Sequence, residues 1–208
     1  MRTLAIETAS EACSIALFEG EARIAHDHRI LGRGHAEALV PMIAALPDKG
    51  RADRILVSLG PGSFTGVRIG LATARALGFA WGAEVLGFPT LALIAAQALA
   101  ARPGSMGVTV CTNGGHGEWF VADFAVDGLP VGAAVSLTPE AACARPHAAL
   151  IAGSRASLRA ENARAEALDI LPDAGAVGLL NPALLTPALA PIYGRGPDAT
   201  PMTAQGAA

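Results

Sequence analysis

The sequence contains few charged residues and almost no lysine. Asp, Glu, Lys and Arg make up 16% of its 208 residues, Lys49 is its single lysine, and its formal net charge is −3. Because contacts to phosphates dominate nucleic-acid affinity, we do not expect a chain with this charge to hold nucleic acid by itself. Its hydrophobic content of 52% excludes a disordered chain and predicts a globular one, large enough for one large domain or two small ones.

Cysteines and long apolar runs are also scarce. The cysteines are Cys13, Cys111 and Cys143. Their odd number and their spacing fit neither a disulfide framework nor a metal site. The longest apolar window, 91–101, is interrupted by Gln97 and is too short to cross a bilayer. Because Glu7 also interrupts any signal-peptide core, we expect a reduced, soluble, cytoplasmic protein without membrane contact.

One stretch, residues 60–70 (GPGSFTGVRIG), organises the rest of the chain. The apolar run at 55–59 predicts a buried strand before it, and 66–81 predicts a helix after it with Thr65 as the N-cap. A strand, a glycine loop and a helix N-terminus can together bind an anion. The glycine spacing, however, matches neither the dinucleotide fingerprint nor a Walker loop. The stretch is therefore not a standard nucleotide cradle.

Small residues recur every four positions along this predicted helix, at Gly70, Ala74 and Gly78. They would let another backbone approach closely, either from a partner or from the same subunit. The partner-binding candidates on the helix are Gly66, Val67, Arg68, Gly70, Leu71, Ala74, Arg75 and Gly78. The two arginines could pair with a partner or simply occupy an exposed face. If the partner interpretation holds, Gly70→Leu or Ala74→Trp abolishes pairing and leaves the monomer folded.

The order of the predicted elements repeats along the chain. Three antiparallel strands, then helix, strand and helix, occur in residues 1–102 and again in 103–190, with a linker at 102–105 and a C-terminal tail over 191–208. We therefore predict the duplicated α/β fold shared by actin, Hsp70 chaperones and sugar kinases, with two βββαβα-type halves of which the second is reduced.

Individual boundaries follow from local signals. The helices of the first half are expected at 35–46, where Pro41 should kink the helix or confine it to a short segment, at 66–81, and from an N-cap at Thr90 to about 101. In the second half we expect a strand over 106–111 followed by a turn at 112–115, a strand over 131–137, and a short helix opened by Thr138 and Pro139. Residues 196–208 are expected to fray.

The stretch 60–70 closely resembles the signature of the TsaB (YeaZ-like) family of tRNA threonylcarbamoyladenosine biosynthesis proteins. Further matches lie at 4–9, 13–17, His35 with 39–42, and 191–195. The resemblance is strong over residues 1–100, weak through the middle, and returns near the end. It implies the duplicated actin-like (ASKHA) fold.

The resemblance also implies a function. Members of the family are noncatalytic subunits that pair through their central helices with TsaD, the metal-bearing transferase that modifies the adenosine next to the anticodon. The ATPase TsaE docks on this pair, and tRNA is reached only through the complex. The resemblance further implies a homodimer in isolation and no cofactor required by the chain itself, while leaving room for ATP or ADP with Mg at the interface of the complex.

Glu7, Thr8 and Ser10 are the nucleotide-binding candidates. In the actin-like superfamily an acidic residue after the first strand binds a magnesium-associated water, and the next turn approaches phosphates. The family usually has aspartate where Glu7 stands, and a solvated carboxylate at a strand end explains Glu7 equally well. Asn113 and Gly115 stand where the family pattern has an acid and an arginine, which weakens any autonomous phosphate chemistry.

The histidines do not predict a metal site. TsaD binds its metal through two histidines four residues apart on a helix, whereas here His35 is followed at that spacing by Leu39. His26 and His28 share one face of a predicted strand, which the polarity of an exposed edge explains.

We predict no catalytic residue, because the hydroxyls at Ser63 and Thr65 have no histidine near them in sequence. The alternative from another class is an autonomous ATP-dependent kinase or ATPase of the actin-like superfamily, which Glu7 favours and Asn113 opposes. A peptidase and a homodimeric scaffold with another partner are further alternatives.

Overall fold

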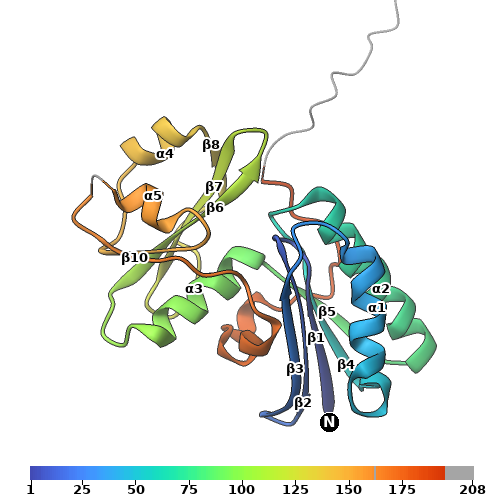
Figure 1. Ribbon diagram of the computed structural model, residues 1–208. Coiled ribbons are helices and arrows are strands. Elements are labelled where there is room, and N and C mark those ends of the chain that lie inside the picture. Colours follow the sequence, from blue (N-terminus) through green and yellow to red (C-terminus); the bar gives the residue numbers. More distant parts are fainter. Residues whose placement is uncertain (162, 195–208) are drawn as a thin grey trace, which may run out of the picture.

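The computed structural model describes residues 1–161 and 163–194, which form two lobes joined by a helix (Figure 1). The elements of the first lobe are β1 (Arg2–Glu7), β2 (Ala12–Glu19), β3 (Ala22–Ile30), α1 (His35–Ala45), η1 (Pro47–Gly50), β4 (Arg54–Ser58), α2 (Phe64–Trp81) and β5 (Glu84–Phe88). The connecting helix is α3 (Thr90–Ala101). The remaining elements are β6 (Gly107–Gly115), β7 (Glu118–Ala125), β8 (Val135–Leu137), α4 (Pro139–Ala144), β9 (Leu150–Ala152), α5 (Ala156–Ala160), β10 (Glu166–Leu168), η2 (Ala174–Leu179) and η3 (Pro182–Leu184).

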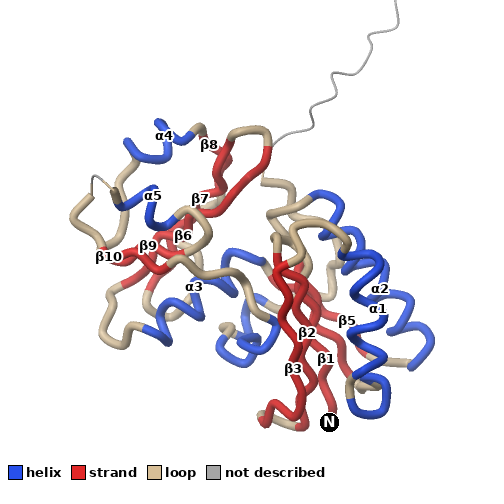
Figure 2. The backbone as a smooth tube through the Cα atoms, viewed as in Figure 1, coloured by secondary structure: helices blue, strands red, loops and turns tan. Residues whose placement is uncertain are grey.

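Each lobe contains a five-stranded mixed sheet with the same connectivity (Figure 2). The first has the order β3-β2-β1-β4-β5, in which β1, β2 and β3 pair antiparallel and β4 and β5 continue parallel to β1. The second has the order β10-β9-β6-β7-β8 and repeats that pattern, with β6, β7 and β8 antiparallel and β9 and β10 parallel to β6. This repetition confirms the predicted duplicated actin-like α/β fold.

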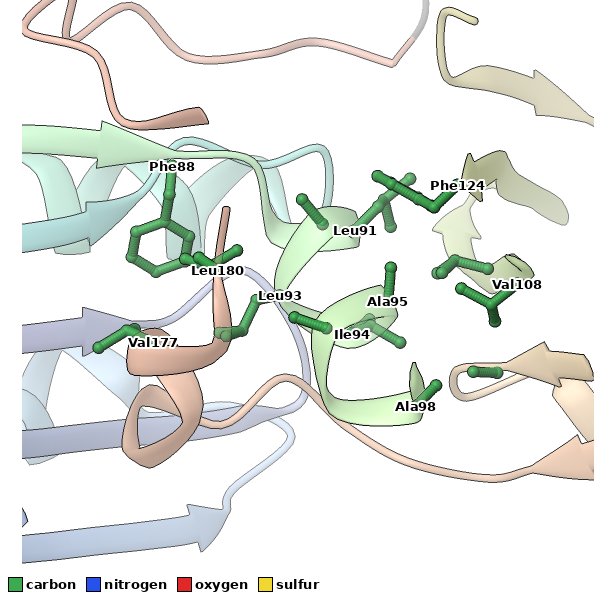
Figure 3. Packing of buried hydrophobic residues seen from close by; sticks show 14 of the residues in the cluster. Phe88, Leu91, Leu93, Ile94, Ala95, Ala98, Val108, Phe124, Val177 and Leu180 are labelled. Atoms are coloured by element: carbon green, nitrogen blue, oxygen red, sulfur yellow. The ribbon is translucent and has the colours of Figure 1, made fainter. Parts of the chain in front are cut away.

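Helix α3 lies between the two sheets and is buried on nearly all sides (Figure 3). Its side chains pack with Phe88 of the first sheet, Val108 and Phe124 of the second, and Val177 of η2. A helix that is apolar around its whole circumference has to be covered all round, as this one is. The lobes therefore share one core, while α1 and α2 cover the outer face of the first sheet and α4 and α5 that of the second.

The chain returns to the first lobe after the second sheet. Helix η2 packs on the first sheet beside α3, where Figure 1 shows it in orange-red. Thr186 then exchanges two backbone hydrogen bonds with Gly87, at 2.7 and 3.0 Å, and the N–H of Ile192 donates to the carbonyl of Leu59 at 2.7 Å. We call residues 172–194 the return segment. The hydrogen bonds to Gly87 and Leu59 attach this segment to the first lobe and so connect the two lobes a second time.

Two predictions for helix ends are wrong. Helix α2 begins at Phe64, and its N-cap is Ser63, whose hydroxyl accepts a hydrogen bond from the N–H of Gly66 at 3.1 Å; Thr65 lies inside the first turn. Helix α3 has Pro89 as its N-cap, so Thr90 is its first residue, with a buried side chain. Helix α1 is not shortened by Pro41 but continues through it.

The second half differs from the prediction in its strands. Strand β6 continues to Gly115 instead of ending in a turn at 112–115, and the turn falls at His116 and Gly117, both with positive φ. Strand β8 covers only 135–137 of the predicted 131–137. The short helix α4 begins as expected, because the Thr138 hydroxyl accepts from the N–H of Ala141 and Pro139 occupies the first position. The tail at 196–208 lies outside the described residues.

The small-residue stripe of α2 faces its own sheet. An added Cβ on Gly66 would overlap the carbonyl oxygen of Thr8, one on Gly70 would overlap the Thr8 hydroxyl, and one on Gly78 would overlap Val85. In turn, the Thr8 hydroxyl donates to the carbonyl of Gly66 at 2.8 Å. The glycines are therefore required because the helix closely approaches Thr8, after β1, and Val85 of β5 within one subunit.

This packing corrects the partner-binding assignment for six of the eight candidates. The buried residues are Gly66, Val67, Gly70, Leu71, Ala74 and Gly78. A partner cannot reach them without removing α2 from its sheet. Arg68 and Arg75 are exposed on the other side of the helix.

Gly70→Leu should therefore unfold the monomer rather than merely prevent pairing. The added side chain has no space beside Thr8, and overpacking of this kind destabilises by about 3 kcal/mol or more when backbone has to move. The matched control is Ala72→Leu on the exposed face, which we expect to change the free energy of unfolding by less than about 0.5 kcal/mol. Urea unfolding followed by circular dichroism measures both. Equal stability of the two variants would contradict this account of the stripe.

Candidate functional site

A cleft with a volume of about 360 Å³ opens between the lobes. The turn after β1, the N-terminus of α2, the β6–β7 hairpin and the end of the return segment form its walls. The lining residues are Ala9, Ser10, Glu11, Gly32, Gly62, Ser63, Phe64, Val67, Asn113, Gly114, Gly115, His116, Phe120, Ile192, Tyr193 and Gly194. Ser10, Asn113 and Gly115, which were singled out in the sequence, thus meet in one cleft.

The lining of this cleft is poor in the charged side chains that hold a magnesium nucleotide. Among the described residues that form it, Glu11 is the single carboxylate, and none is a lysine or an arginine. Phosphates could contact the backbone N–H groups at the N-terminus of α2, but the cleft offers only one carboxylate for Mg²⁺. The cleft offers Asn113 and Gly115 at the positions where the family pattern has an acid and an arginine.

Glu7 does not face the cleft, because it is completely buried at the end of β1. One carboxyl oxygen, Oε1, accepts a hydrogen bond from the N–H of Ala9 at 2.5 Å. The other, Oε2, is buried without a hydrogen-bond partner among the described residues, as are the hydroxyls of Ser58 and Thr90. These two hydroxyls lie near enough to favour the charged carboxylate, although neither completes a bond of normal geometry.

Burial governs the protonation of Glu7. It disfavours the charged form and raises the pKa of Glu7 from 4.5 to about 7, although the N–H of Ala9 and the nearby hydroxyls act in the opposite direction. The predicted role of Glu7 in holding a magnesium-associated water is therefore wrong for this conformation, and so is its alternative as a solvated carboxylate. Thr8 is equally buried and is bonded to α2, so of the three nucleotide-binding candidates Ser10 alone reaches the cleft.

The two exposed arginines of α2 contact the return segment. The guanidinium of Arg68 lies 3.1 Å from the centroid of the Phe64 ring, and its Nη2 donates to the Tyr193 hydroxyl at 2.5 Å. Arg75 donates to the carbonyl of Leu189 at 2.7 Å. Both arginines thus have partners within the chain, and any role in binding another protein stays a proposal.

Helices α1 and α2 lie side by side on the first sheet (Figure 1). We call the side of this pair that faces away from the sheet the α1–α2 outer face. Its exposed apolar residues include Val40, Pro41, Ala44, Ala72, Ala76, Phe79 and Ala80, and the charged Glu37, Arg68 and Arg75 are exposed on the same two helices. Phe79 is 93% exposed and Val40 58% exposed. The side of α2 opposite the glycines carries Ala72, Ala76 and Phe79 together with the exposed Arg68 and Arg75, so the sequence contained only a weak signal for an apolar surface.

His35 has a structural role that the sequence did not show. It is buried at the start of α1, and its Nε2 atom lies 3.1 Å from the carbonyl oxygen of Ala12. This contact fixes the N-terminus of α1 to β2.

In the part of the chain that the structure describes, no helix combines the length and apolar character needed to cross a membrane.

The fold and the cleft define a two-lobed protein of the actin-like class, in which the acidic residue at the end of the first strand, Glu7, is completely buried. Comparison with known proteins assigns the chain to a family within this class. A family model described as "TsaD: tRNA N6-adenosine threonylcarbamoyltransferase" matches residues 28–158. The chain belongs to the TsaB (YeaZ-like) branch of this family.

Individual relatives support this placement. The tRNA threonylcarbamoyladenosine biosynthesis protein TsaB of Escherichia coli is 37% identical over 61% of this chain; the match spans 56% of that protein, a little over half its length. An uncharacterized protein of Mycobacterium tuberculosis is 34% identical, with 96% of this chain and 94% of the other covered. The solved structure of YeaZ from Pseudomonas aeruginosa has a TM-score of 0.76 at 28% identity and covers 92% of this chain and 99% of its own.

The raised pKa of Glu7 predicts a stability that falls with pH. Between pH 4.5 and about 7 the unfolded chain releases the Glu7 proton while the folded chain keeps it, so this residue destabilises the fold progressively as the pH rises. Glu7→Gln removes this loss, and the free energy of unfolding of the variant relative to wild type should increase by about 2–3 kcal/mol from pH 5 to pH 8.

Urea unfolding at both pH values measures this difference. The exposed Glu21→Gln serves as the control and should show no such change between the two conditions. A constant difference between wild type and Glu7→Gln across this range would show that Glu7 is ionised in the folded protein.

Proposed function

We propose that this chain is a noncatalytic subunit of the machinery that makes threonylcarbamoyladenosine in tRNA, and that it pairs with a TsaD-type transferase through the α1–α2 outer face. Membership of the family supports the pathway. The observation that supports the pairing is the uncovered apolar surface of two adjacent helices, with Phe79 93% exposed on it.

The chemistry of this surface favours a protein partner. Large apolar side chains gathered on one exposed face mark sites of association more often than solvated surface. A partner with the same fold would present two corresponding helices, and the small side chains of Ala72, Ala76 and Ala44 would let helices from both subunits pack closely. The same surface could pair with itself, which is the isologous arrangement of a homodimer, until the transferase replaces one copy.

Two observations support the absence of catalysis by the chain alone. An autonomous kinase or ATPase of the actin-like class needs an acid that faces the cleft, whereas Glu7 is sealed below it. The described lining of the cleft also lacks basic side chains that could hold phosphates. A nucleotide at the complex interface would therefore need groups from the partner.

The proposal includes two further partners, tRNA and a TsaE-type ATPase. With a net charge of −3, the chain depends on its partner for contact with tRNA. The proposal also includes docking of the TsaE-type ATPase on the assembled pair, on the model of the family.

A charge placed on the outer face should prevent pairing. We expect Phe79→Glu to weaken binding to the TsaD of the same organism by at least about 30-fold, because the carboxylate would lose its water in an apolar interface. Isothermal titration calorimetry measures the affinity. The control is Met106→Glu, which alters an equally exposed apolar side chain, 89% exposed, on the other lobe. Unchanged affinity of Phe79→Glu would rule out this face as the interface.

The pathway itself is tested in cells. We expect depletion of the protein to lower threonylcarbamoyladenosine in bulk tRNA severalfold, as measured by mass spectrometry of digested tRNA. Wild type and Met106→Glu should restore the modification and Phe79→Glu should not. An unchanged level of the nucleoside after depletion would contradict the proposed function, whatever the outcome of the binding assay.

A further inference from the structure

Two histidines and an aspartate meet at the edge of the first sheet, remote from the cleft and the α1–α2 outer face. His26 and His28 are two residues apart on β3, so their side chains project from the same face of the sheet. Their cross-strand neighbours on β2 are Ala16 and Ser14. Asp173 comes from the return segment, which covers this face immediately before η2.

The potential donor atoms of the three side chains converge. A ring nitrogen of each histidine and a carboxylate oxygen of Asp173 all lie within 4.8 Å of one another. His26 Nε2 is 2.6 Å from Asp173 Oδ1, and His28 Nδ1 is 3.9 Å from the same oxygen. The Nδ1 atom of His28 is buried and has no hydrogen-bond partner among the described residues. A buried polar atom without a partner is costly, which suggests that a ligand completes the arrangement.

Asp173 is held in place by groups other than the histidines. Its Oδ1 atom accepts hydrogen bonds from the Ser14 hydroxyl at 3.0 Å and from the N–H of Gly175 at 2.7 Å. The carboxylate is therefore oriented before any ligand arrives. Among the described residues, Arg23 lies close by and donates to the carbonyl of Gly175 at 3.3 Å.

We propose that His26, His28 and Asp173 bind a divalent transition-metal ion of the zinc class. Two imidazole nitrogens and one carboxylate oxygen are a typical zinc donor set, with water in the fourth position, whereas Mg²⁺ and Ca²⁺ prefer oxygen ligands alone. Ligands about 2.0–2.1 Å from a tetrahedral ion lie about 3.3–3.4 Å apart. Two of the three donor separations, 2.6 and 3.9 Å, bracket this value, and the separation between the two histidine nitrogens is at most 4.8 Å, so shifts of about 1.5 Å or less complete the site.

The bound ion would connect two parts of the chain that lie far apart in sequence. Edge strand β3 and the return segment would then be joined by coordinate bonds. These would replace the hydrogen bond between His26 and Asp173, whose two atoms become ligands, and would add to the hydrogen bond from Arg23 to the carbonyl of Gly175. Because the folded chain presents this site and the unfolded chain does not, binding stabilises the fold by mass action. The site is thus a clamp that holds the return segment on the first sheet.

Titration of the metal-free full-length chain with Zn²⁺ tests the proposal. All proteins in the test carry Cys143→Ser, because the exposed thiol of Cys143 could bind zinc independently. We expect one equivalent to bind with a Kd in the micromolar range or tighter, and the thermal midpoint to rise with Zn²⁺ concentration. His28→Gln should weaken binding at least tenfold, and the exposed His147→Gln, the matched control, should leave it unchanged.

His28 is the variant of choice because its Nδ1 atom makes no hydrogen bond in the described structure, so its replacement should leave the fold intact. Far-ultraviolet circular dichroism of the metal-free variant checks this. Co²⁺ provides a second readout, since a tetrahedral site with imidazole ligands gives strong visible absorption that His28→Gln should abolish. Absence of a stoichiometric site in the parent protein, or binding by a folded His28→Gln variant as tight as in the parent, would overturn the proposal.

Discussion

The close approach of α2 to the end of β1 determines which side of α2 is exposed to other molecules. Gly66 and Gly70 let the helix backbone come down onto Thr8, whose hydroxyl bonds to the helix at Gly66, and the N–H of Ser63 donates to the carbonyl of Ala9 at 2.7 Å. These contacts fix the rotation of the helix about its axis. Once the glycine side faces the sheet, the side that carries Phe79 has to face outward.

The same region accounts for the chemistry that the chain lacks. Glu7 ends β1 directly before Thr8, and its carboxyl group is enclosed by Ala9, Ser58 and Thr90. A carboxyl group exposed to water would be charged at neutral pH, but burial keeps the proton of Glu7 up to about neutral pH. The actin-like fold is retained here with its first acidic position turned into part of the core. The cleft beside it is polar but contains few charged side chains.

The sequence predicted the fold better than the site. Element order and hydrophobic pattern sufficed for the duplicated α/β architecture, because strands and long helices have strong periodic signals. The glycine spacing predicted a close backbone approach at Gly70 and Ala74 but could not say whose backbone approaches, since a partner and the chain's own sheet require the same small residues. Local signals also misplaced caps, because Ser63 and Thr65 are both acceptable cap residues for α2 and Thr90 is one for α3.

The sequence could not predict contacts between segments that are far apart along the chain. His26 and His28 looked like the polar edge of a strand because nothing in the local sequence indicates Asp173, which lies 147 residues after His26. Strand β10 and helix η2 are too short for a periodic pattern, so the return of the chain to the first lobe was not foreseen. Likewise, the burial of Glu7 depends on how Ser58 and Thr90 pack around it, and sequence spacing carries no information on that packing.

Hydrogen–deuterium exchange of the chain, alone and bound to its TsaD partner, tests most directly whether the glycine side of α2 is internal and the opposite side is the docking surface. Amides of α1 and α2 should already exchange slowly on the sheet-facing side in the free chain, and binding should add protection in peptides from His35–Ala45 and Phe64–Trp81. Protection that appeared only in the second lobe or around the cleft, with α1 and α2 unchanged, would contradict the account.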